Sequence, residues 1–529
     1  MTYFETQSLC LCEIPLIKQL PRIAAFNPQQ RSKGHEDMKT FLTTTAGDNL
    51  NIISRLGISY KEEGFKKVGV RLLRTPTFLI GRGDSPSDAG NLRRRMNAPV
   101  QYNAARGEKV PIHVVLVVHR DLMRDDVVRQ VYERKVADLI NAMGSKFQLG
   151  RTPGHDMTVI EHNGSPDDHF GKVNDWSKHV TSGDVNMNGD KKIYFVIDFH
   201  KPPVARRQRE VEYLAIKKEL GAVGCLSQFV NFTNNAHHRP GTRASYSIFQ
   251  NVNRQILAKC GLNIWRVSIP PELPLPAMFV GLDVCHSPRR MRDRKFERKD
   301  SVAACVALIV TSHESDDCID RVVSCQVQTQ DKAGTEVNLE KLIENTIASA
   351  VSGREPGSDP LRSCIMWRDG VGDTTVQSTA DLESSAIRKA FEDMSISCPL
   401  AYVVCQKDIS TKFLAMKDSK PYGLKEGMLV ENLNHPDFAQ TFYIHGNCPP
   451  NSTPKSVRFI VGEKDSELSN VRLEELSWNM CFDYPNWTGP IQLPAPTKMA
   501  HKLADAAANL DDLGESLNFK EFQNTLFFL

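Results

Sequence analysis

The sequence of 529 residues lacks several features that would assign it to a class at once. Its 13 cysteines form no Cys-x-x-Cys pair and no zinc-type Cys/His spacing, so we expect reduced thiols and a cytoplasmic protein, with the nucleus as the second candidate compartment. Its apolar runs, such as Val302–Val310, are far shorter than the ~20 residues of a membrane span. No basic region followed by an apolar core opens the chain, so we expect no secretory signal and no membrane partner.

The composition is also free of strong bias. With 40% hydrophobic and 24% charged residues, and without internal repeats or low-complexity tracts, the chain is not disordered, collagen-like or a coiled coil as a whole. The net charge of +3 indicates no particular partner. Lys201–Arg266, however, holds eleven Lys or Arg and three acids, so the rest of the chain is slightly acidic. Such a basic stretch indicates either a polyanion site or a chance cluster on a solvated surface.

The order of apolar and amphipathic segments predicts two α/β regions after an N-terminal segment, residues 1–109, in which no packed domain is obvious. In residues 110–275, strands and helices alternate, which favours an open, mostly parallel sheet with helices on both faces. The expected strands are Val110–Val118, Lys192–Phe199 and Gly224–Phe232, and the expected helices are Asp125–Gly144, Glu210–Leu220 and Ala244–Lys259. A proline-rich break, Pro270–Pro276, ends this region.

In residues 276–529, three strands follow one another closely, as in an antiparallel meander. A helix, a strand, a second helix, another strand and two C-terminal helices come next. This order is typical of a ribonuclease-H-like fold. The expected segments are Met278–Val284, Val302–Ser312 and Val322–Thr329, helix Glu336–Val351, strand Arg362–Arg368, helix Asp381–Met394 and strand Ala401–Gln406.

Two aspartates follow apolar strands in this second region. Asp283 ends the run MFVGLD and Asp369 ends CIMWRD. Carboxylates at neighbouring strand ends can share Mg²⁺ ions, which prefer oxygen ligands and act on phosphodiesters. A single Asp at a strand end is a weak signal, because turns use Asp for local hydrogen bonds.

Basic and amide residues in the first region form a second candidate site. Tyr213 and Lys217 are four residues apart on a predicted helix and so share one face. Gln255 and Lys259 recur at the same interval, beside an apolar stripe on the later helix. Lys259 therefore lies at the margin of a buried face, where its charge requires an anion. This pattern predicts a phosphate site.

Three motifs carry a specific resemblance. AMFVGLDVCHSP, IMWRDGVGD and LPAPTKMAHKLA occur in the order, and on the elements, of the PIWI domain of Argonaute/Piwi proteins. The resemblance implies that Asp283, Asp369 and His501 are metal ligands of a catalytic centre. It also implies that Glu336, in Gly334-Thr335-Glu336, is the fourth ligand, with Glu340 or Glu344 as alternatives.

The same resemblance extends to the predicted phosphate site. The spacing of its residues around GCLSQFV is similar to that of the family's MID domain, which holds the 5′ phosphate of a guide strand. Tyr213 would stack on the first base, and Lys217, Gln228, Gln255 and Lys259 would bind phosphate. The apolar end LFFL is Piwi-like, and Leu529 would supply a carboxylate that acts together with a further metal ion.

The resemblance covers about 420 of the 529 residues, from roughly Val110 onward. Residues 1–109 resemble, less specifically, the connector between PAZ and MID domains, and no PAZ domain is recognisable. A fragment, a truncated gene prediction and a naturally short protein all remain open explanations. Two segments depart from the family pattern: the long basic loop Arg289–Lys299, and Gln406-Lys407-Asp408, where an acid replaces a basic residue while Lys407 and Lys412 remain.

We therefore expect a Rossmann-like MID domain, 110–275, followed by a ribonuclease-H-like PIWI domain, 276–529. The implied function is silencing guided by a small RNA with a 5′ phosphate. Two Mg²⁺ or Mn²⁺ ions would support endonucleolytic cleavage of the paired target RNA, with DNA as the second target class. A guided RNA-binding silencer that does not cut and an unguided ribonuclease-H-type nuclease are the alternatives.

Overall fold

A computed structural model of the whole chain provides the structure. The residues that it describes are 29–30, 33–34, 36–37, 67–79, 112–120, 157–163, 165, 168, 171–173, 175–176, 193–200, 217, 220, 225–231, 252, 254–256, 258–259, 265–285, 290–292, 295–297, 301–311, 323–329, 339–354, 356–418, 420–431, 438, 440–446, 455–511 and 526–529. They belong to two compact units, one formed by 75–406 with 460–529 and the other by 1–74 with 407–459.

The larger unit contains a mixed sheet built around β8 (Ala277–Cys285). β11 (Val302–Val310) pairs with β8 on one side, and β12 (Val323–Thr329) pairs with β11, both antiparallel. On the other side, β13 (Ser363–Asp369) and β14 (Leu400–Gln406) follow in parallel. The spatial order of these five strands is β12-β11-β8-β13-β14. If the five are numbered along the chain, this is the order 3-2-1-4-5, which confirms the ribonuclease-H-like arrangement expected from the sequence.

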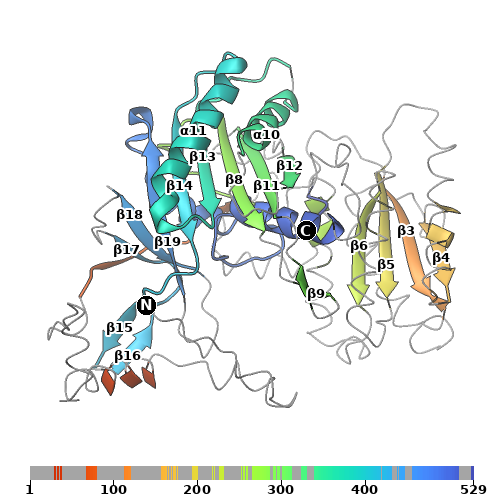
Figure 1. Cartoon of the computed structure of the whole chain (residues 1–529), viewed down its shortest axis with the longest axis horizontal. Coiled ribbons are helices and arrows are strands. Elements are labelled where there is room, and N and C mark those ends of the chain that lie inside the picture. The colour runs from red at the N-terminus through yellow and green to blue at the C-terminus, as the bar shows by residue number, and fades with distance from the viewer. Residues whose placement is uncertain are drawn as a thin grey trace. The chain divides into compact units, whose positions relative to one another are not determined.

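These strands are continuous apolar runs because helices cover both faces of the sheet. α10 (Glu340–Ser352) and α11 (Val376–Asp393) pack against each other, as Figure 1 shows. α12 (Leu473–Met480) and α13 (Ala495–Asp511) supply the opposite side. Adjacent residues of β13 point to opposite faces. Accordingly, the Trp367 indole donates to Ser477 of α12 (2.9 Å), whereas Arg368 reaches α11.

A second sheet of four strands lies earlier in the chain, in the order β4-β3-β5-β6. β3 (Ile112–His119), β4 (Met157–His162), β5 (Ile193–His200) and β6 (Leu226–Asn231) all run parallel. The core beside it contains Val115, Val117, Val173, Leu220 and Cys225. This is the open parallel sheet that the sequence predicted, with β4 as a strand that the apolar pattern did not reveal.

The smaller unit contains β1 (Val70–Leu72), β17 (Met428–Glu431) and β18 (Thr441–His445), which pair in that order and antiparallel. The hairpin β15 (Leu414–Lys417) and β16 (Lys420–Gly423) belongs to the same unit. β19 (Ser456–Lys464) crosses the boundary between the two units. The sequence pattern predicted none of β15 to β19, because these strands are short or only partly apolar.

The remaining strands are short. β2 (Phe78–Leu79) pairs with β7 (Arg266–Val267), and β9 (Arg290–Arg292) pairs with β10 (Lys295–Glu297) inside the basic loop. The 3₁₀ helices are η4 (Asp373–Thr375) and η5 (Ser466–Leu468). Helix Asp125–Gly144 falls outside the described residues. None of the helices in the described part of the chain is long and apolar enough to cross a membrane.

Candidate functional site

The two aspartates of the sequence motifs lie side by side at the ends of neighbouring parallel strands. β8 and β13 are in register with Leu282 opposite Arg368, so Asp283 and Asp369 follow at equivalent positions and on the same face. Asp283 is 4% exposed and Asp369 is 1% exposed. Two carboxylates are therefore held in a buried position, where charged groups require compensation.

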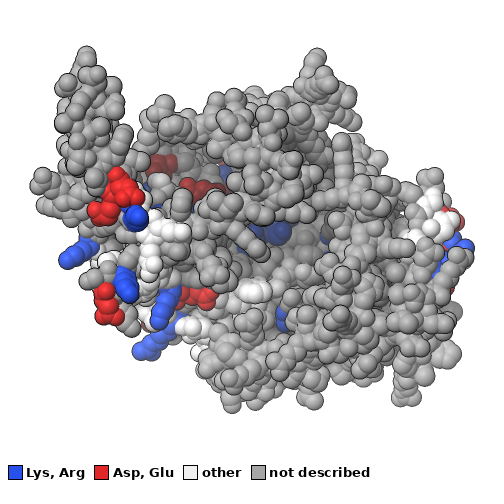
Figure 2. All heavy atoms as spheres, turned by 90° about the horizontal axis from the view of Figure 1, so that it is seen from below, with Lys and Arg blue, Asp and Glu red and all other residues white. Residues whose placement is uncertain are grey.

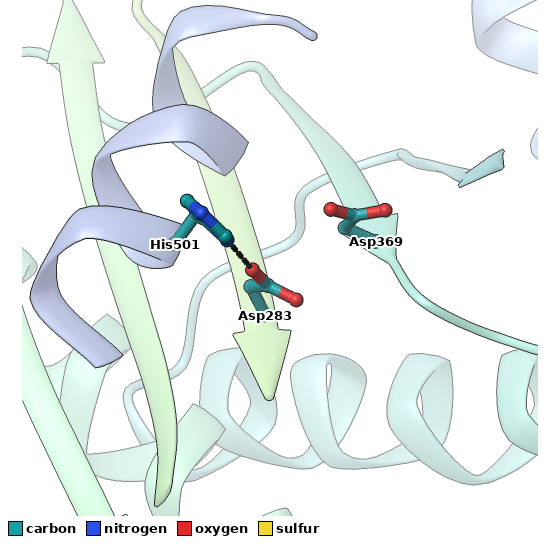
Figure 3. Close-up of side chains that lie close together, drawn as sticks. All are labelled: Asp283, Asp369 and His501. Carbon is teal, nitrogen blue, oxygen red and sulfur yellow. Dashed lines mark hydrogen bonds and ion pairs between the residues drawn. The ribbon is translucent and has the colours of Figure 1, made fainter. Parts of the chain in front are cut away.

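A close helix–strand contact brings the third residue to them. Gly281, two residues before Asp283 on the same face, lies against the start of α13. A Cβ atom at this position would be 2.1 Å from the carbonyl carbon of Pro496. Because glycine has no side chain, the helix can approach the strand this closely. His501, on the next turn of α13, is thereby placed over Asp283 (Figure 3).

The three side chains form one compact cluster. Nδ1 of His501 is 2.6 Å from Oδ2 of Asp283, and the backbone N–H of Val284 donates to Oδ1 of Asp283 at 2.8 Å. One ligand atom from each of Asp283, Asp369 and His501 lies within 4.8 Å of the others. Figure 3 shows the side chains coming from β8, β13 and α13, with the dashed contact joining His501 to Asp283.

This donor set fits a hard divalent cation. Mg²⁺ and Mn²⁺ prefer carboxylate oxygens, and Mn²⁺ also accepts imidazole nitrogen. Among the residues that the structure describes, Asp283, Asp369 and His501 are the group of His, Cys, Asp or Glu that could hold such an ion. A cation there would offset the charge of two buried carboxylates.

The fourth predicted ligand, Glu336, falls outside the described residues. Its alternatives, Glu340 and Glu344, are half-buried on α10 and are not part of the three-residue cluster. The Lys389 ammonium of α11 donates to Oε1 of Glu344 at 2.6 Å, so this carboxylate pairs with the neighbouring helix. The assignment of Glu336 stays a prediction.

The predicted phosphate residues that the structure describes also meet. The Lys259 ammonium is 2% exposed and donates to Oε1 of Gln228 (3.0 Å) and to the carbonyl of Ser227 (2.8 Å). Nε2 of Gln228 donates in turn to Oε1 of Gln255 (3.0 Å). A chain of polar groups thus joins β6 to the helix that carries Gln255 and Lys259.

The other members of this predicted site are less closely defined. Lys217 is helical and half-buried, and Tyr213 falls outside the described residues. Leu529 is half-buried, and its N–H donates to the carbonyl of Leu526 (3.1 Å). The three apolar residues before Leu529 are buried, so the chain end is packed. Their roles toward a guide stay predictions.

The structure describes parts of both segments that depart from the family pattern. Asp408 is exposed and lies 3.6 Å from Lys455, and the Lys412 ammonium donates to the carbonyl of Ile409 (2.9 Å). In the basic loop Arg289–Lys299, the structure describes only the backbone of the β9–β10 hairpin. Neither observation assigns a function.

One set of polar residues that lies near the cluster was not predicted from the sequence. Arg368, Glu383 and Tyr402 form a buried polar network directly behind Asp369. The signal for Arg368 was present, since a charged residue interrupts the apolar strand CIMW just before Asp369. Glu383 gave none, because an acid within a helix is normally read as a solvated side chain.

A known protein family matches more than half of the chain. The model of the family described as Piwi domain matches residues 204–512. Among curated proteins, Piwi-like protein Ago3 of Bombyx mori is 27% identical over 57% of this chain and 30% of its own length. Piwi-like protein 1 of Schmidtea mediterranea is 28% identical over 56% of this chain and 35% of its own length. The chain thus spans about a third of the length of these curated relatives.

Solved structures share the fold. Drosophila Piwi superposes with a TM-score of 0.72 at 17% identity, covering 97% of this chain and 64% of that one. Kluyveromyces polysporus Argonaute with a guide RNA gives a TM-score of 0.67 at 14% identity, covering 98% and 62%. Clostridium butyricum Argonaute, bound to a guide DNA and a 19-mer target DNA, gives 0.65 at 15% identity, covering 97% and 61%.

Proposed function

Because this chain belongs to the Piwi domain family, we propose that it binds a guide strand and uses the Asp283 centre to cut nucleic acid paired with that guide. In this proposal, residues 110–275 act as a MID domain and 276–529 as a PIWI domain. The guide is a small RNA, and the target is RNA, with DNA as the second class. Two solved structures with this fold carry a guide RNA and a guide DNA, respectively.

The observation that carries the proposal is the pair of aspartates in register on β8 and β13, with His501 held against one of them. These side chains would hold Mg²⁺ or Mn²⁺, with Glu336 as a further ligand. Such ions, when bound, activate water and neutralise charge on the scissile phosphate. The protein's own contribution is to fix the two carboxylates rigidly at strand ends and to orient Asp283 through His501 and the Val284 amide.

Cleavage of a matched target by the guide-loaded protein tests this centre. We expect a single cut at a fixed distance from the guide 5′ end, dependent on Mg²⁺ or Mn²⁺. Asp369→Asn should abolish cutting, by more than about a thousandfold, while guide affinity stays unchanged. Asp393→Asn is the matched control, because Asp393 is an exposed acid at the end of α11 that lies outside the cluster.

An uncut target across a range of Mg²⁺ and Mn²⁺ concentrations would replace this proposal with the guided protein that binds without cutting. Substitution of Glu336 and of Glu340 by Gln in the same assay identifies the fourth ligand. Only the correct substitution should match the loss caused by Asp369→Asn.

For guide binding, the proposal relies on the buried chain of Lys259, Gln228 and Gln255, with Lys217 and Tyr213 beside it. An unguided nuclease has no need of a buried lysine that donates to Gln228, with Gln228 held in turn by Gln255. On the face drawn in Figure 2, the described Lys and Arg side chains are interspersed with Asp and Glu and form no patch of one sign. The proposal depends on this specific cluster.

We expect 5′-phosphorylated guides to bind more tightly than 5′-hydroxyl guides. A charge-assisted hydrogen bond contributes about 1.5–3 kcal/mol, so Lys259→Gln should reduce this preference by about tenfold or more. Lys389→Gln, which changes an exposed lysine of α11, is the matched control. Equal affinity of the unmodified protein for both guide forms, measured by filter binding, would contradict the guide-anchoring role.

A further inference from the structure

A buried ion pair lies on the face of the sheet opposite the aspartate cluster. Nε of Arg368, in β13, is 3.0 Å from Oε1 of Glu383 in α11, and the hydroxyl of Tyr402, in β14, donates to Oε2 of Glu383 at 2.6 Å. Arg368 is 1% exposed, Glu383 is 6% exposed and Tyr402 is fully buried. Three elements of the core are therefore joined through one carboxylate.

This network is connected to the cluster through the backbone. The Arg368 guanidinium also donates to the backbone carbonyl of Asp369. Asp369 is the last residue of β13, and the chain turns immediately afterwards at Gly370, whose φ is +86°. Glu383 of α11 holds Arg368, and Arg368 in turn holds the carbonyl of Asp369. The end of β13 is therefore tied to α11.

A second contact holds the same turn from the β14 side. Nε2 of Gln406 donates to the carbonyl of Val371 and to Oδ1 of Asp373, both at 2.8 Å. The residues that follow Asp369 are thus tied on one side to α11 and on the other to β14. The direction of the Asp369 carboxylate depends on the backbone at this turn.

Stability alone gives a poor account of the ion pair. Removing two charges from water is costly, and well-packed apolar residues in place of a buried ion pair are often neutral or stabilising. A metal centre, in contrast, requires its ligands to be held within about 0.5 Å by the groups behind them. Side chains that orient metal ligands from outside the coordination sphere commonly change metal affinity by about 10- to 100-fold.

We propose that Glu383, acting through Arg368, is a positioning residue that fixes Asp369 for metal binding. The role as a metal centre rests on the proposed function. The positioning of the Asp369 turn does not, because it follows from hydrogen bonds within the protein. The two parts can therefore be tested separately.

The principal variant replaces the ion pair with apolar residues of similar size, Arg368→Met with Glu383→Leu. We expect a folded protein whose thermal midpoint changes little, because relieving the burial of two charges offsets the loss of the hydrogen bond from the Tyr402 hydroxyl. We expect its Mn²⁺ affinity, measured by electron paramagnetic resonance without nucleic acid, to fall at least about tenfold. Amide hydrogen exchange at residues 370–372 of the metal-free protein should accelerate by at least about tenfold, because the turn loses its tie to α11.

Arg388 provides the matched control. It lies on the same helix and forms an ion pair with Asp465 at 2.7 Å and with Glu463 at 2.5 Å. In the described part of the chain, the Arg388 guanidinium donates to Asp465 and Glu463 and not to the Asp369 turn. Arg388→Met should leave Mn²⁺ affinity and the exchange of residues 370–372 unchanged.

Two milder variants are available if the double variant does not fold. Arg368→Lys keeps the charge opposite Glu383 but cannot bridge Glu383 and the Asp369 carbonyl as a guanidinium does. Tyr402→Phe removes only the hydroxyl contact with Glu383. Both should weaken Mn²⁺ binding and speed exchange, with the larger effect for Arg368→Lys.

Unchanged exchange at residues 370–372 in a folded variant that lacks the network would overturn the positioning role, whatever the metal result. Faster exchange with unchanged Mn²⁺ affinity would overturn the link to metal binding. If the unmodified protein binds no Mn²⁺, the proposed metal centre itself fails, while the exchange measurement still decides the positioning of the turn.

Discussion

Gly281→Ala should disrupt the metal cluster without touching any of its ligands. The added Cβ would lie 2.1 Å from the carbonyl carbon of Pro496 and 2.3 Å from the backbone nitrogen of Thr497. Carbon atoms in contact are about 3.5 Å apart, so the start of α13 would have to move by about 1 Å or more. These atoms belong to the backbone and cannot rotate away. We therefore expect a loss near the upper end of the usual overpacking cost, about 3 kcal/mol.

The displacement of α13 is larger than the roughly 0.5 Å within which a ligand set must be held. His501 lies one turn further along the helix, so its contact with Asp283 should lengthen and Mn²⁺ affinity should fall. Thermal unfolding and Mn²⁺ titration of the same protein measure the two effects. Both losses are expected together.

Two other glycines separate these effects. Gly372→Ala should be neutral, because its nearest neighbour would be Thr375 Oγ1 at 3.9 Å. Gly462→Ala should destabilise the protein with a smaller loss of Mn²⁺ affinity than Gly281→Ala, since its Cβ would lie 2.7 Å from Ala380 Cβ on α11, the helix that reaches Asp369 through Glu383 and Arg368. If Gly281→Ala behaved like Gly372→Ala in both assays, the close approach of α13 to β8 would not be what places His501.

Two further substitutions test local features of the fold. Burial lowers the pKa of His445 from 6.5 to about 4, so the unfolded chain takes up a proton first as the pH falls. The free energy of unfolding should therefore fall between about pH 6.5 and 4, by about 2 kcal/mol at pH 5. In His445→Gln this contribution should be absent, so urea unfolding curves measured at pH 7 and pH 5 should differ by about 2 kcal/mol less than in the unmodified protein. Gly370→Ala should cost about 1–2 kcal/mol in thermal unfolding, because φ is +86° while the added Cβ meets only Asp283 Oδ1 at 3.9 Å. An unchanged midpoint for Gly370→Ala, or an unchanged pH dependence for His445→Gln, would contradict the corresponding argument.

Much of the larger unit could be predicted from sequence because its strands are buried on both faces. The run at 302–310 is buried at every position, so its apolar pattern survives without alternation. The expected strand Met278–Val284 agrees with β8 within one residue at each end. The helix expected at Asp381–Met394 begins five residues earlier, at Val376, because a 3₁₀ turn over Asp373–Thr375 leads directly into it.

The strands from β15 to β19 could not be predicted in the same way. Met416 is 63% exposed in β15, and Val70 and Leu72 are exposed in β1, so the apolar residues of β15 and β1 do not indicate a core face, while β17 and β18 are only four and five residues long. β1 pairs with β17, which is more than 350 residues away along the chain. Local pattern carries no information about a partner at that distance, so this unit is defined by pairing that only the structure reveals.

For the site, the motifs predicted which residues belong together, and the register of β8 and β13 explains why they meet. The motifs gave no indication of how the ligands are held, because the groups that hold them are ordinary residues in sequence: a glycine at 281 and an acid at 383. Their importance depends on distances to Pro496 and to Arg368 that arise only after folding. Sequence reasoning is strongest where chemistry requires a residue type, and weakest where geometry requires only an empty space or a buried partner.

The pleat of β13 couples the core to the cluster through two consecutive residues. Asp369 points to the face covered by α13, and Arg368 points to the face covered by α11, since neighbouring side chains of a strand alternate. A change in the packing of α11 therefore acts on Arg368 first and reaches the Asp369 carboxylate through the carbonyl that Arg368 holds. Substitutions at Glu383 should alter metal binding more than substitutions of equal size at exposed positions of the same helix, such as Leu382, although neither residue is near the ligands in sequence.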